Sequence, residues 1–252
     1  MKASKLYKYL DVKGGLAMLS NSNLQFTNAT RLNDPFDCHP SLIDFSNVPE
    51  EQKAVWGQEL IMNAESSQFE QRRNGTWLCS LSKVNNSLLM WSYYSNHKGV
   101  CIGLDMENTR KYLSNILCTV FIGAKEFVVQ YKDIIEKPDF FKEKKDLWRY
   151  QLSTKAKEWE HEQEVRLFIY EPSPWNMKLL SPSNDKENHY YREQKTFVRL
   201  HPKCFESIYL GVNIKAKDKE DIIQKAKNLN PDIIIYQMDI DSQSFNVIEK
   251  LE

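Results

Sequence analysis

Two glutamates and an arginine occupy alternate positions in one short segment of the sequence. Glu162, Glu164 and Arg166 are each separated by one residue, and alternate side chains of a β-strand lie on one face, so we predict that these three point the same way. Val165 and Leu167 would then pack on the opposite face. Two carboxylates about 7 Å apart beside a cation suit a site that hydrogen-bonds a hydroxyl or stabilises developing positive charge. The alternative is a solvated edge strand on which Arg166 pairs with a neighbouring carboxylate.

A second group of polar and aromatic residues precedes Gly99. We expect a helix to end in this region, with Gly99 allowing the chain to turn into the following strand. Tyr94 could stack on a ligand, and His97 is a candidate general acid or base. The alternative is that Trp91 and Tyr94 face the core while His97 caps the helix. We predict that Trp91 is mainly structural, whereas Tyr94 and His97 face a cleft.

The third candidate region, residues 33–39, is rich in Asn, Asp and Pro. Pro35 restricts the residue before it, and short polar side chains can hydrogen-bond their own backbone, so a rigid loop forms with or without a function. We predict that residues 33–37 are ordered and lie near the face that carries Glu162 and Glu164. No spacing matches a known metal signature, so no metal is predicted. Two metal-binding sets stay open as alternatives: Asp34, Asp37 and His39, or His161 and Glu164.

The elements that must position these residues mix strands and helices irregularly. Alternating apolar residues predict strands near 6–10, 24–27, 76–81, 99–104, 126–131, 163–170, 207–210, 232–238 and 245–248. Helical spacing and capping residues predict helices near 12–19, 49–69, 87–94, 139–159 and 217–228, with Asp11 capping the first and Ser87 the third. Residues 28–40 are expected to form a structured loop, and 171–189 a long loop or insertion.

This pattern predicts one α+β domain over residues 1–252, with a largely antiparallel or mixed central sheet flanked by helices. The motifs fall in residues 1–170, and residues 190–252 form a strand-helix-strand part. Neither a glycine-rich dinucleotide motif nor a Walker A motif is present, which disfavours a Rossmann enzyme and a P-loop NTPase.

Composition excludes several classes of protein. Lys plus Arg and Asp plus Glu both number 34, and this zero formal charge argues against a dedicated duplex nucleic-acid binder. No apolar run approaches the roughly 18 residues of a membrane-spanning helix, and the first residues lack a secretory signal, so we expect a cytoplasmic protein. The five cysteines are widely spaced, which predicts neither a disulfide framework nor a zinc knuckle.

Taken in order, these segments resemble DUF2971, a bacterial family of domains of unknown function. The pieces that carry the resemblance are Leu6–Tyr9, Asn33–Asp37, the strand with Ser80, Leu89–Ser92, Tyr94, His97–Gly103, Trp159, Glu162, Glu164 and Arg166. Together they span most of residues 1–170. The family name carries no established reaction.

The layout is more loosely similar to ADP-ribosyltransferase-like domains, which carry Glu-x-Glu or Gln-x-Glu on a late strand. Residues 162–164, Glu-Gln-Glu, match that motif. The similarity implies that Glu164 bonds the ribose 2′-hydroxyl of NAD and stabilises the oxocarbenium-like state as nicotinamide leaves, while Glu162 orients or activates the acceptor. NAD is then the expected substrate, and the ligand is a nucleotide-type small molecule.

The same similarity implies ligand-binding roles on earlier strands. In such domains a polar residue of the first strand holds the adenylate side of NAD, and Tyr7 and Lys8 stand where those enzymes usually have Arg or His. The middle position, which orients the nicotinamide ribose, falls to Ser80 or Tyr94. Further candidate ligand-binding residues are Asn33, Asp34, Trp91 and Arg166.

Three hypotheses for function follow. The first is an intracellular bacterial NAD-utilising enzyme of ADP-ribosyltransferase or NAD glycohydrolase type, acting as a toxin or phage-defence effector, with Glu164, Glu162 and His97 as catalytic candidates. The second is a metal-dependent nuclease or phosphodiesterase that uses Asp34, Asp37, His97 and Glu164. The third is a non-enzymatic ligand-sensing or protein-binding module with a surface formed by Trp91, Tyr93 and Tyr94. Convergence of Glu164, Tyr94 and Asn33 on one pocket would favour an enzyme, and dispersal would favour the module.

Overall fold

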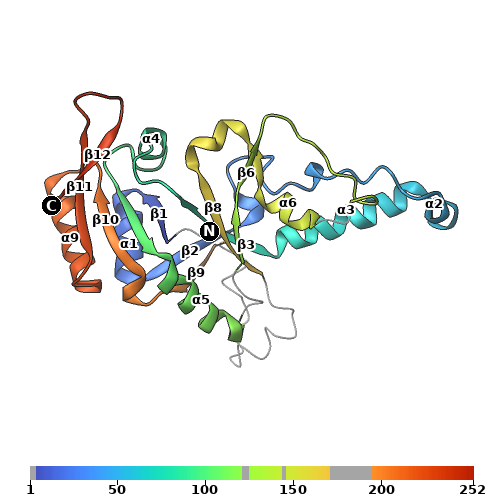
Figure 1. Ribbon diagram of the computed structural model, residues 1–252. Helices are drawn as coiled ribbons and strands as arrows, with labels where there is room; N and C mark the ends of the chain where they lie inside the picture. Colours follow the sequence, from blue (N-terminus) through green and yellow to red (C-terminus); the bar gives the residue numbers. More distant parts are fainter. Residues whose placement is uncertain (1–3, 121–124, 144–145, 171–194) are drawn as a thin grey trace.

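The computed structural model describes residues 4–120, 125–143, 146–170 and 195–252 (Figure 1). The strands are β1 (Lys5–Leu10), β2 (Asn23–Asn28), β3 (Thr76–Ser82), β4 (Val100–Asp105), β5 (Lys125–Val128), β6 (Gln130–Lys132), β7 (Thr154–Ala156), β8 (Glu164–Tyr170), β9 (Lys195–Arg199), β10 (Phe205–Leu210), β11 (Ile234–Ile240) and β12 (Val247–Leu251). The α-helices are α1 (Val12–Asn21), α2 (Glu50–Trp56), α3 (Gln58–Asn74), α4 (Leu88–Ser95), α5 (Met106–Val120), α6 (Leu147–Ser153) and α9 (Ala216–Leu229). Short 3₁₀ turns are η1 (Ala29–Arg31), η2 (Pro40–Leu42), η3 (Lys157–Glu162) and η4 (Pro202–Cys204). The loop expected at 171–189 lies outside the described residues.

One large sheet organises the fold. Its strands follow the order β12-β11-β10-β4-β1-β3-β2-β9, and β8 pairs with β3 and β5 beside this path. Most neighbouring strands are antiparallel, whereas β10 and β11 are parallel and are joined across α9. The prediction of an α+β fold with a largely antiparallel sheet is therefore confirmed.

Strand alternation divides the core between the two faces of the sheet. In β1, Leu6 packs into the main core cluster, which includes residues of α1 and α9, while Tyr9 packs on the opposite face against Trp91 of α4. Both helix starts are capped as the sequence predicts, because the side chains of Asp11 and Ser87 accept backbone N–H groups of α1 and α4. Helices α1 and α4 thus cover opposite faces of the sheet.

Gly99 has a different role from the one expected. Helix α4 ends at Ser95, and the two residues that follow, Asn96 and His97, both adopt the left-handed conformation, with φ of 51° and 54°. A Cβ at Gly99 would overlap the carbonyl oxygen of Leu10. The glycine therefore permits close backbone packing between β4 and the end of β1, while the turn itself is made by the two preceding residues.

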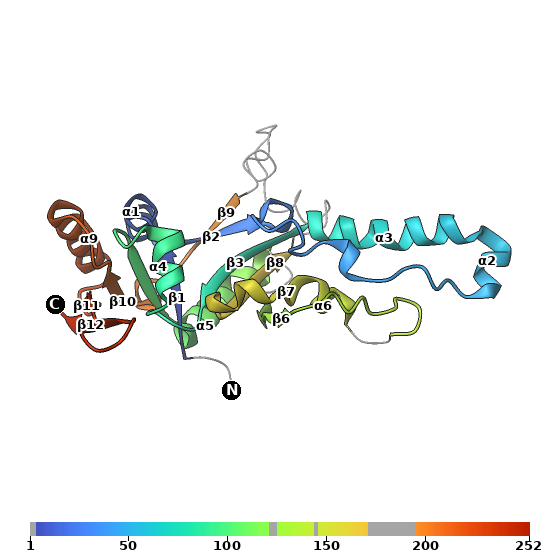
Figure 2. The same cartoon turned by 90° about the horizontal axis from the view of Figure 1, so that it is seen from above.

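Helices α2 and α3 extend away from the sheet as an arm (Figures 1 and 2). The sequence predicts one helix here, but Gly57, with φ of 77°, separates the two. A small apolar cluster that includes Phe45, Phe69 and Leu147 joins the base of the arm to α6. At this base, the ring centroids of Phe45 and Phe69 lie 5.4 Å apart.

The helix predicted at residues 139–159 is wrong, whereas the strand predicted at residues 126–131 is present but divided. The long charged helix expected at 139–159 is reduced to α6, after which the chain forms β7 and η3. The strand expected at 126–131 is divided into β5, which pairs with β8, and β6, which pairs with β7. The reason is that Lys155, read from the sequence as part of a solvated helix face, is drawn into a buried cluster of carboxylates.

Candidate functional site

The candidate site lies where the central sheet divides along one edge of β3. Strand β1 meets this edge at Tyr7 and Ser82, and β2 meets it farther along, at Leu78 and Trp77. Between these two pairings, the Lys8 ammonium donates a hydrogen bond of 2.8 Å to the Ser80 carbonyl oxygen. The split therefore exposes the middle of β3 to a pocket instead of to a neighbouring strand.

A polar pocket of about 280 Å³ opens at this split. It is lined by Tyr7, Lys8, Tyr9, Thr27, Arg31, Leu32, Asn33, Asp37, Ser80, Leu81, Ser82, Met90, Tyr94, Lys155, Glu162 and Glu164. The lining comes from β1, β2, the loop after η1, β3, α4, β7, η3 and β8, so only the tertiary structure assembles it.

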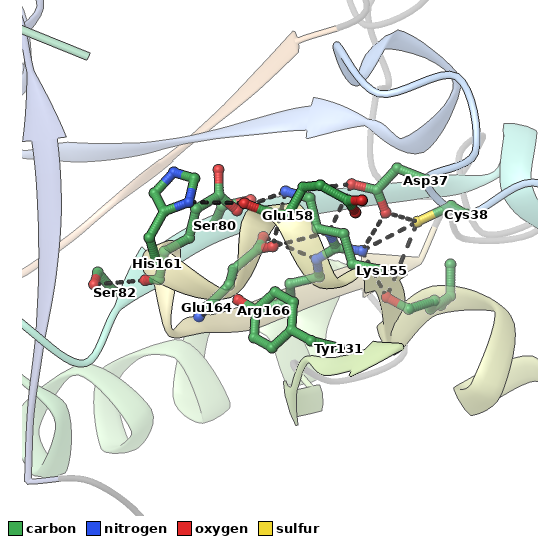
Figure 3. Close-up of polar contacts among 12 residues, drawn as sticks. Asp37, Cys38, Ser80, Ser82, Tyr131, Lys155, Glu158, His161, Glu164 and Arg166 are labelled. Atoms are coloured by element: carbon green, nitrogen blue, oxygen red, sulfur yellow. Dashed lines mark hydrogen bonds and ion pairs between the residues drawn. The ribbon is translucent and has the colours of Figure 1, made fainter. Parts of the chain in front are cut away.

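Arg166 lies at the centre of a buried ion-pair cluster, several members of which line the pocket (Figure 3). Its guanidinium is fully buried and binds two carboxylates in bidentate fashion. Nη1 and Nη2 each lie 2.7 Å from an oxygen of Asp37, and Nε and Nη2 lie 2.8 and 2.9 Å from the oxygens of Glu164. Nη1 also donates to the carbonyl oxygen of Leu152 at 2.8 Å. Such a fully bonded guanidinium fixes the positions of both carboxylates.

Lys155 extends this cluster towards the pocket. Its ammonium lies 2.6 Å from Glu162 Oε2, 3.5 Å from Glu164 Oε2 and 3.8 Å from Asp37 Oδ2. The other oxygen of Glu162, Oε1, accepts a hydrogen bond of 2.7 Å from the Tyr94 hydroxyl. Three carboxylates thus surround two cations. Tyr94 is the last residue in this series of contacts, and it lines the pocket.

The electrostatics favour the charged forms of Glu164 and Lys155. Burial alone would raise the pKa of Glu164, but Arg166 and Lys155 outweigh burial and lower that pKa to about 2. Burial opposes the charged form of Lys155, yet the surrounding carboxylates, Glu164 foremost, raise its pKa above the ordinary value. Burial and the negative charge of Glu162 raise the pKa of Tyr94. The tyrosine is therefore a stable hydroxyl donor to Glu162 at physiological pH.

The structure brings together most of the residues that the sequence singled out. Asn33, Tyr94 and Glu164 line the same pocket, which is the convergence that was expected for an enzyme. Tyr7, Lys8, Ser80 and Glu162 also line it. The loop prediction is confirmed as well, because Asp37 binds Arg166 and so holds residues 33–37 beside the two glutamates.

Three candidates lie elsewhere. His97 lines a separate pocket with Leu88, Asn213 and the turn between β11 and β12, so it does not join the carboxylates. Trp91 is 1% exposed and donates its indole N–H to the Asn85 carbonyl oxygen, which confirms its structural role and removes it from any ligand surface. Asp34 is buried outside the pocket lining, and its Oδ1 accepts the Phe36 backbone N–H.

The solvated edge strand considered for Glu162–Arg166 is wrong. Strand β8 lies between β3 and β5, and all three charged side chains are buried. Glu162 is not on the strand, since it ends η3 and is followed by Gln163 in the left-handed conformation. Glu162 and Glu164 therefore lie close together because both contact Lys155, and Arg166 also binds Glu164. Strand alternation alone does not place them there.

Sequence reasoning missed Lys155 and Arg31 as lining residues. Lys155 lies in a charged segment that was read as one helix, and its pairing with Glu162 across seven residues has no helical period. Arg31 follows β2 and ends η1. A possible signal for it is its position two residues before the Asn33–Asp37 loop.

The metal-dependent arrangement is not assembled. The carboxylates of Asp37 and Glu164 both bind Arg166, which occupies the space between them, and His97 lines another pocket. Within the described ranges, no group of three or more His, Cys, Asp or Glu side chains could hold a metal ion. The surface expected from Trp91, Tyr93 and Tyr94 is not formed either, since Trp91 is buried.

Fold and site together define an α+β protein whose divided sheet holds a polar pocket over a buried ion-pair cluster. The family model "Protein of unknown function (DUF2971)" matches residues 90–167, so the family resemblance is confirmed over the segment from α4 to β8. This segment contains Tyr94, Lys155, Glu162, Glu164 and Arg166. Comparison with curated proteins and with solved structures gave no match, and the similarity to ADP-ribosyltransferase-like domains stays a hypothesis. In the part of the chain that the structure describes, no helix is long and apolar enough to cross a membrane.

Proposed function

We propose that the pocket binds NAD and that the protein is an NAD-utilising enzyme of ADP-ribosyltransferase or NAD glycohydrolase type. The observation that carries the proposal is that β1, β3 and β8 are neighbours and contribute to one pocket. They supply Lys8, Ser80 and Glu164, and Glu162 follows from the turn before β8. A first-strand cation, a middle-strand serine and a late Glu-x-Glu pair are the elements that the loose resemblance requires, and the sheet order makes them meet.

The lining suits the reacting half of this substrate. The rings of Tyr7 and Tyr94 offer aromatic surface on which a nicotinamide ring can pack. Glu162 and Glu164 offer negative charge near a ribose and a positively charged ring. A cavity of about 280 Å³ is at the lower end of the ~300–1,000 Å³ typical of ligand pockets. We therefore expect it to enclose the nicotinamide and its ribose, with the rest of the dinucleotide at the mouth.

The contacts favour Glu162 as the carboxylate that meets the substrate. Both oxygens of Glu164 accept hydrogen bonds from Arg166, so its charge is largely neutralised within the cluster. Oε1 of Glu162, in contrast, accepts from Tyr94, whose side chain is 40% exposed on the pocket wall. A ribose hydroxyl can replace the tyrosine hydroxyl there without breaking the Lys155 contact. In this proposal Glu164 and Lys155 hold Glu162 in place.

The reaction proposed is cleavage of the nicotinamide–ribose bond. The C1′–N bond breaks, its electron pair leaves with neutral nicotinamide, and positive charge develops on the ribose. The oxygen of water or of an acceptor then bonds to C1′ and loses its proton. A carboxylate held beside the ribose lowers the barrier because it interacts more strongly with the developing cation than with the ground state.

The test is nicotinamide release from NAD by wild type, Glu162→Gln and Glu164→Gln, with thermal melting of each protein. We expect both substitutions to lower turnover by orders of magnitude, while NAD still raises the melting temperature. Activity is measured below the melting transition of each variant, so that loss of folding is not mistaken for loss of catalysis. Glu160→Gln is the matched control, because Glu160 belongs to the same turn but forms an exposed pair with Lys157.

Two results would overturn the proposal. One is that wild type releases no nicotinamide, with or without candidate acceptors, and NAD does not shift its melting temperature. The other is that Glu162→Gln and Glu164→Gln both retain wild-type turnover. A role as a toxin or phage-defence effector adds a cellular expectation: induced expression of wild type in bacteria lowers cellular NAD, and expression of Glu162→Gln does not.

A further inference from the structure

The charges of the pocket are separated into two zones. The inner zone holds Asp37, Glu162 and Glu164, which pair with Lys155 and Arg166. Two other cations line the pocket, the half-buried Lys8 and the exposed Arg31, and we call these two residues the outer zone. A ligand that fits both zones needs a cationic or hydroxyl-bearing end inside and an anionic group outside.

Among the described residues, neither outer cation has a carboxylate partner. Lys8 donates one hydrogen bond, to the neutral Ser80 carbonyl oxygen, which leaves two of its three N–H donors for other partners. Arg31 is exposed, and no ion pair or hydrogen bond to another described side chain involves it. Lys155, the remaining cation in the lining, is paired with carboxylates. Lys8 and Arg31 therefore carry the positive charge that an anionic group of a ligand can use.

The backbone around Arg31 is held in place, although the structure gives the Arg31 side chain no partner among the residues that it describes. The Asn28 side chain accepts hydrogen bonds from the Thr30 backbone N–H and hydroxyl, at 3.0 and 2.6 Å. The Asn28 amide also donates to the Asn74 carbonyl oxygen at 2.7 Å. On the far side, the Asp37–Arg166 pair fixes the loop that follows. The backbone of Arg31 is thus tied at both ends beside the pocket mouth.

We infer that Arg31 binds the diphosphate of a dinucleotide whose nicotinamide ribose occupies the inner zone. This inference rests on the proposed NAD site and adds the residue that selects a phosphorylated ligand. The planar guanidinium can bind two phosphate oxygens at once. Arg31 is an exposed residue of the lining, so it can meet a part of the dinucleotide that a pocket of this size leaves outside. Arg31 is a binding residue here and takes no part in bond cleavage.

The experiment compares two ligands and three variants. Dissociation constants for NAD and for nicotinamide riboside, which lacks phosphate, are measured by calorimetry on the full chain for wild type, Arg31→Gln and Arg31→Lys. Arg199→Gln is the control, because Arg199 is also exposed but does not line the pocket. All four proteins should fold alike, since these are exposed positions.

We expect Arg31→Gln to weaken NAD binding about 10- to 100-fold, as for the loss of a charge-assisted hydrogen bond. Binding of nicotinamide riboside should be unchanged, and Arg31→Lys should recover part of the loss. If wild type binds NAD but Arg31→Gln binds it equally well, or weakens both ligands equally, the inference is overturned while the NAD site stands. If wild type binds neither ligand, the proposed function itself fails and the inference falls with it.

Discussion

Glu164→Gln should destabilise the fold as well as lower activity. The carboxylate is 3% exposed, and its two oxygens accept from Nε and Nη2 of Arg166 at 2.8 and 2.9 Å. Glutamine can keep one of these bonds, but its amide N–H groups face N–H groups of the guanidinium at the other. Removing one partner of a buried ion pair costs about 3–5 kcal/mol. Because Arg166 keeps both bonds to Asp37, we expect the lower end, about 3 kcal/mol.

The lowered pKa of Glu164 corresponds to a similar magnitude and predicts a pH dependence. The pKa of Glu164 is lowered from 4.5 to about 2 in the folded protein. A carboxylate with a lowered folded-state pKa contributes stability that is fully present above its unfolded value and is lost as pH falls through the folded value. A shift of this size corresponds to about 3 kcal/mol at neutral pH. The stability difference between wild type and Glu164→Gln should therefore shrink as pH falls from 4.5 towards 2.

The assay is urea or thermal unfolding of both proteins across this pH range. At neutral pH we expect the melting temperature of Glu164→Gln to be lower by about 6–12 °C, from the ~2–4 °C per kcal/mol typical of chains near this size. Glu160→Gln should melt within about 2–4 °C of wild type, because an exposed pair contributes at most about 1 kcal/mol. An unchanged melting temperature for Glu164→Gln, or a difference that does not vary with pH, would refute the assignment of Glu164 as a buried partner of Arg166.

Three further perturbations test the surroundings of the site. Arg166→Met should cost about 3–5 kcal/mol in urea unfolding, because it leaves two buried carboxylates without their shared cation; a loss below about 1 kcal/mol would contradict this. Gly99→Ala should cost about 1–3 kcal/mol by the same measurement, since its methyl group overlaps the Leu10 carbonyl oxygen, and wild-type stability would show that the backbone moves freely. Tyr94→Phe removes the hydroxyl that donates to Glu162, so it should lower the free energy of unfolding by about 0.5–1.5 kcal/mol. If a ligand displaces the tyrosine hydroxyl on binding, this variant should change KM for NAD more than kcat. Values of kcat and KM equal to those of wild type would oppose that displacement.

Local sequence signals located most of the secondary structure. Asp11 and Ser87 cap the helices that they were expected to cap, and the apolar alternation near residues 100 and 208 marks β4 and β10. These elements depend on interactions within a few residues of the chain, which sequence patterns record directly. The turn-rich segment after β2 was likewise expected to be ordered, and the ion pair between Asp37 and Arg166 holds it in place.

Longer-range interactions overrode the local signals around residue 155. Lys and Glu at mixed spacings between 139 and 159 favour an exposed helix. Lys155 nevertheless lies within 4 Å of three carboxylates, of which Glu162 and Glu164 follow it closely in sequence and Asp37 comes from a distant part of the chain. A buried charge must be paired. The residue pattern of a single segment does not reveal which residue elsewhere in the chain will be the partner. The helix therefore ends at Ser153.

The sequence by itself determined the α+β class, the family resemblance and the residue types of the site. Only the tertiary structure decided which of those residues meet. It placed Lys8, Asn33 and Tyr94 around the Glu162–Glu164 pair and His97 in another pocket, because the sheet order sets β1, β3 and β8 side by side. Strand order is fixed by packing among segments more than seventy residues apart, and the spacing of residues along the chain does not encode it.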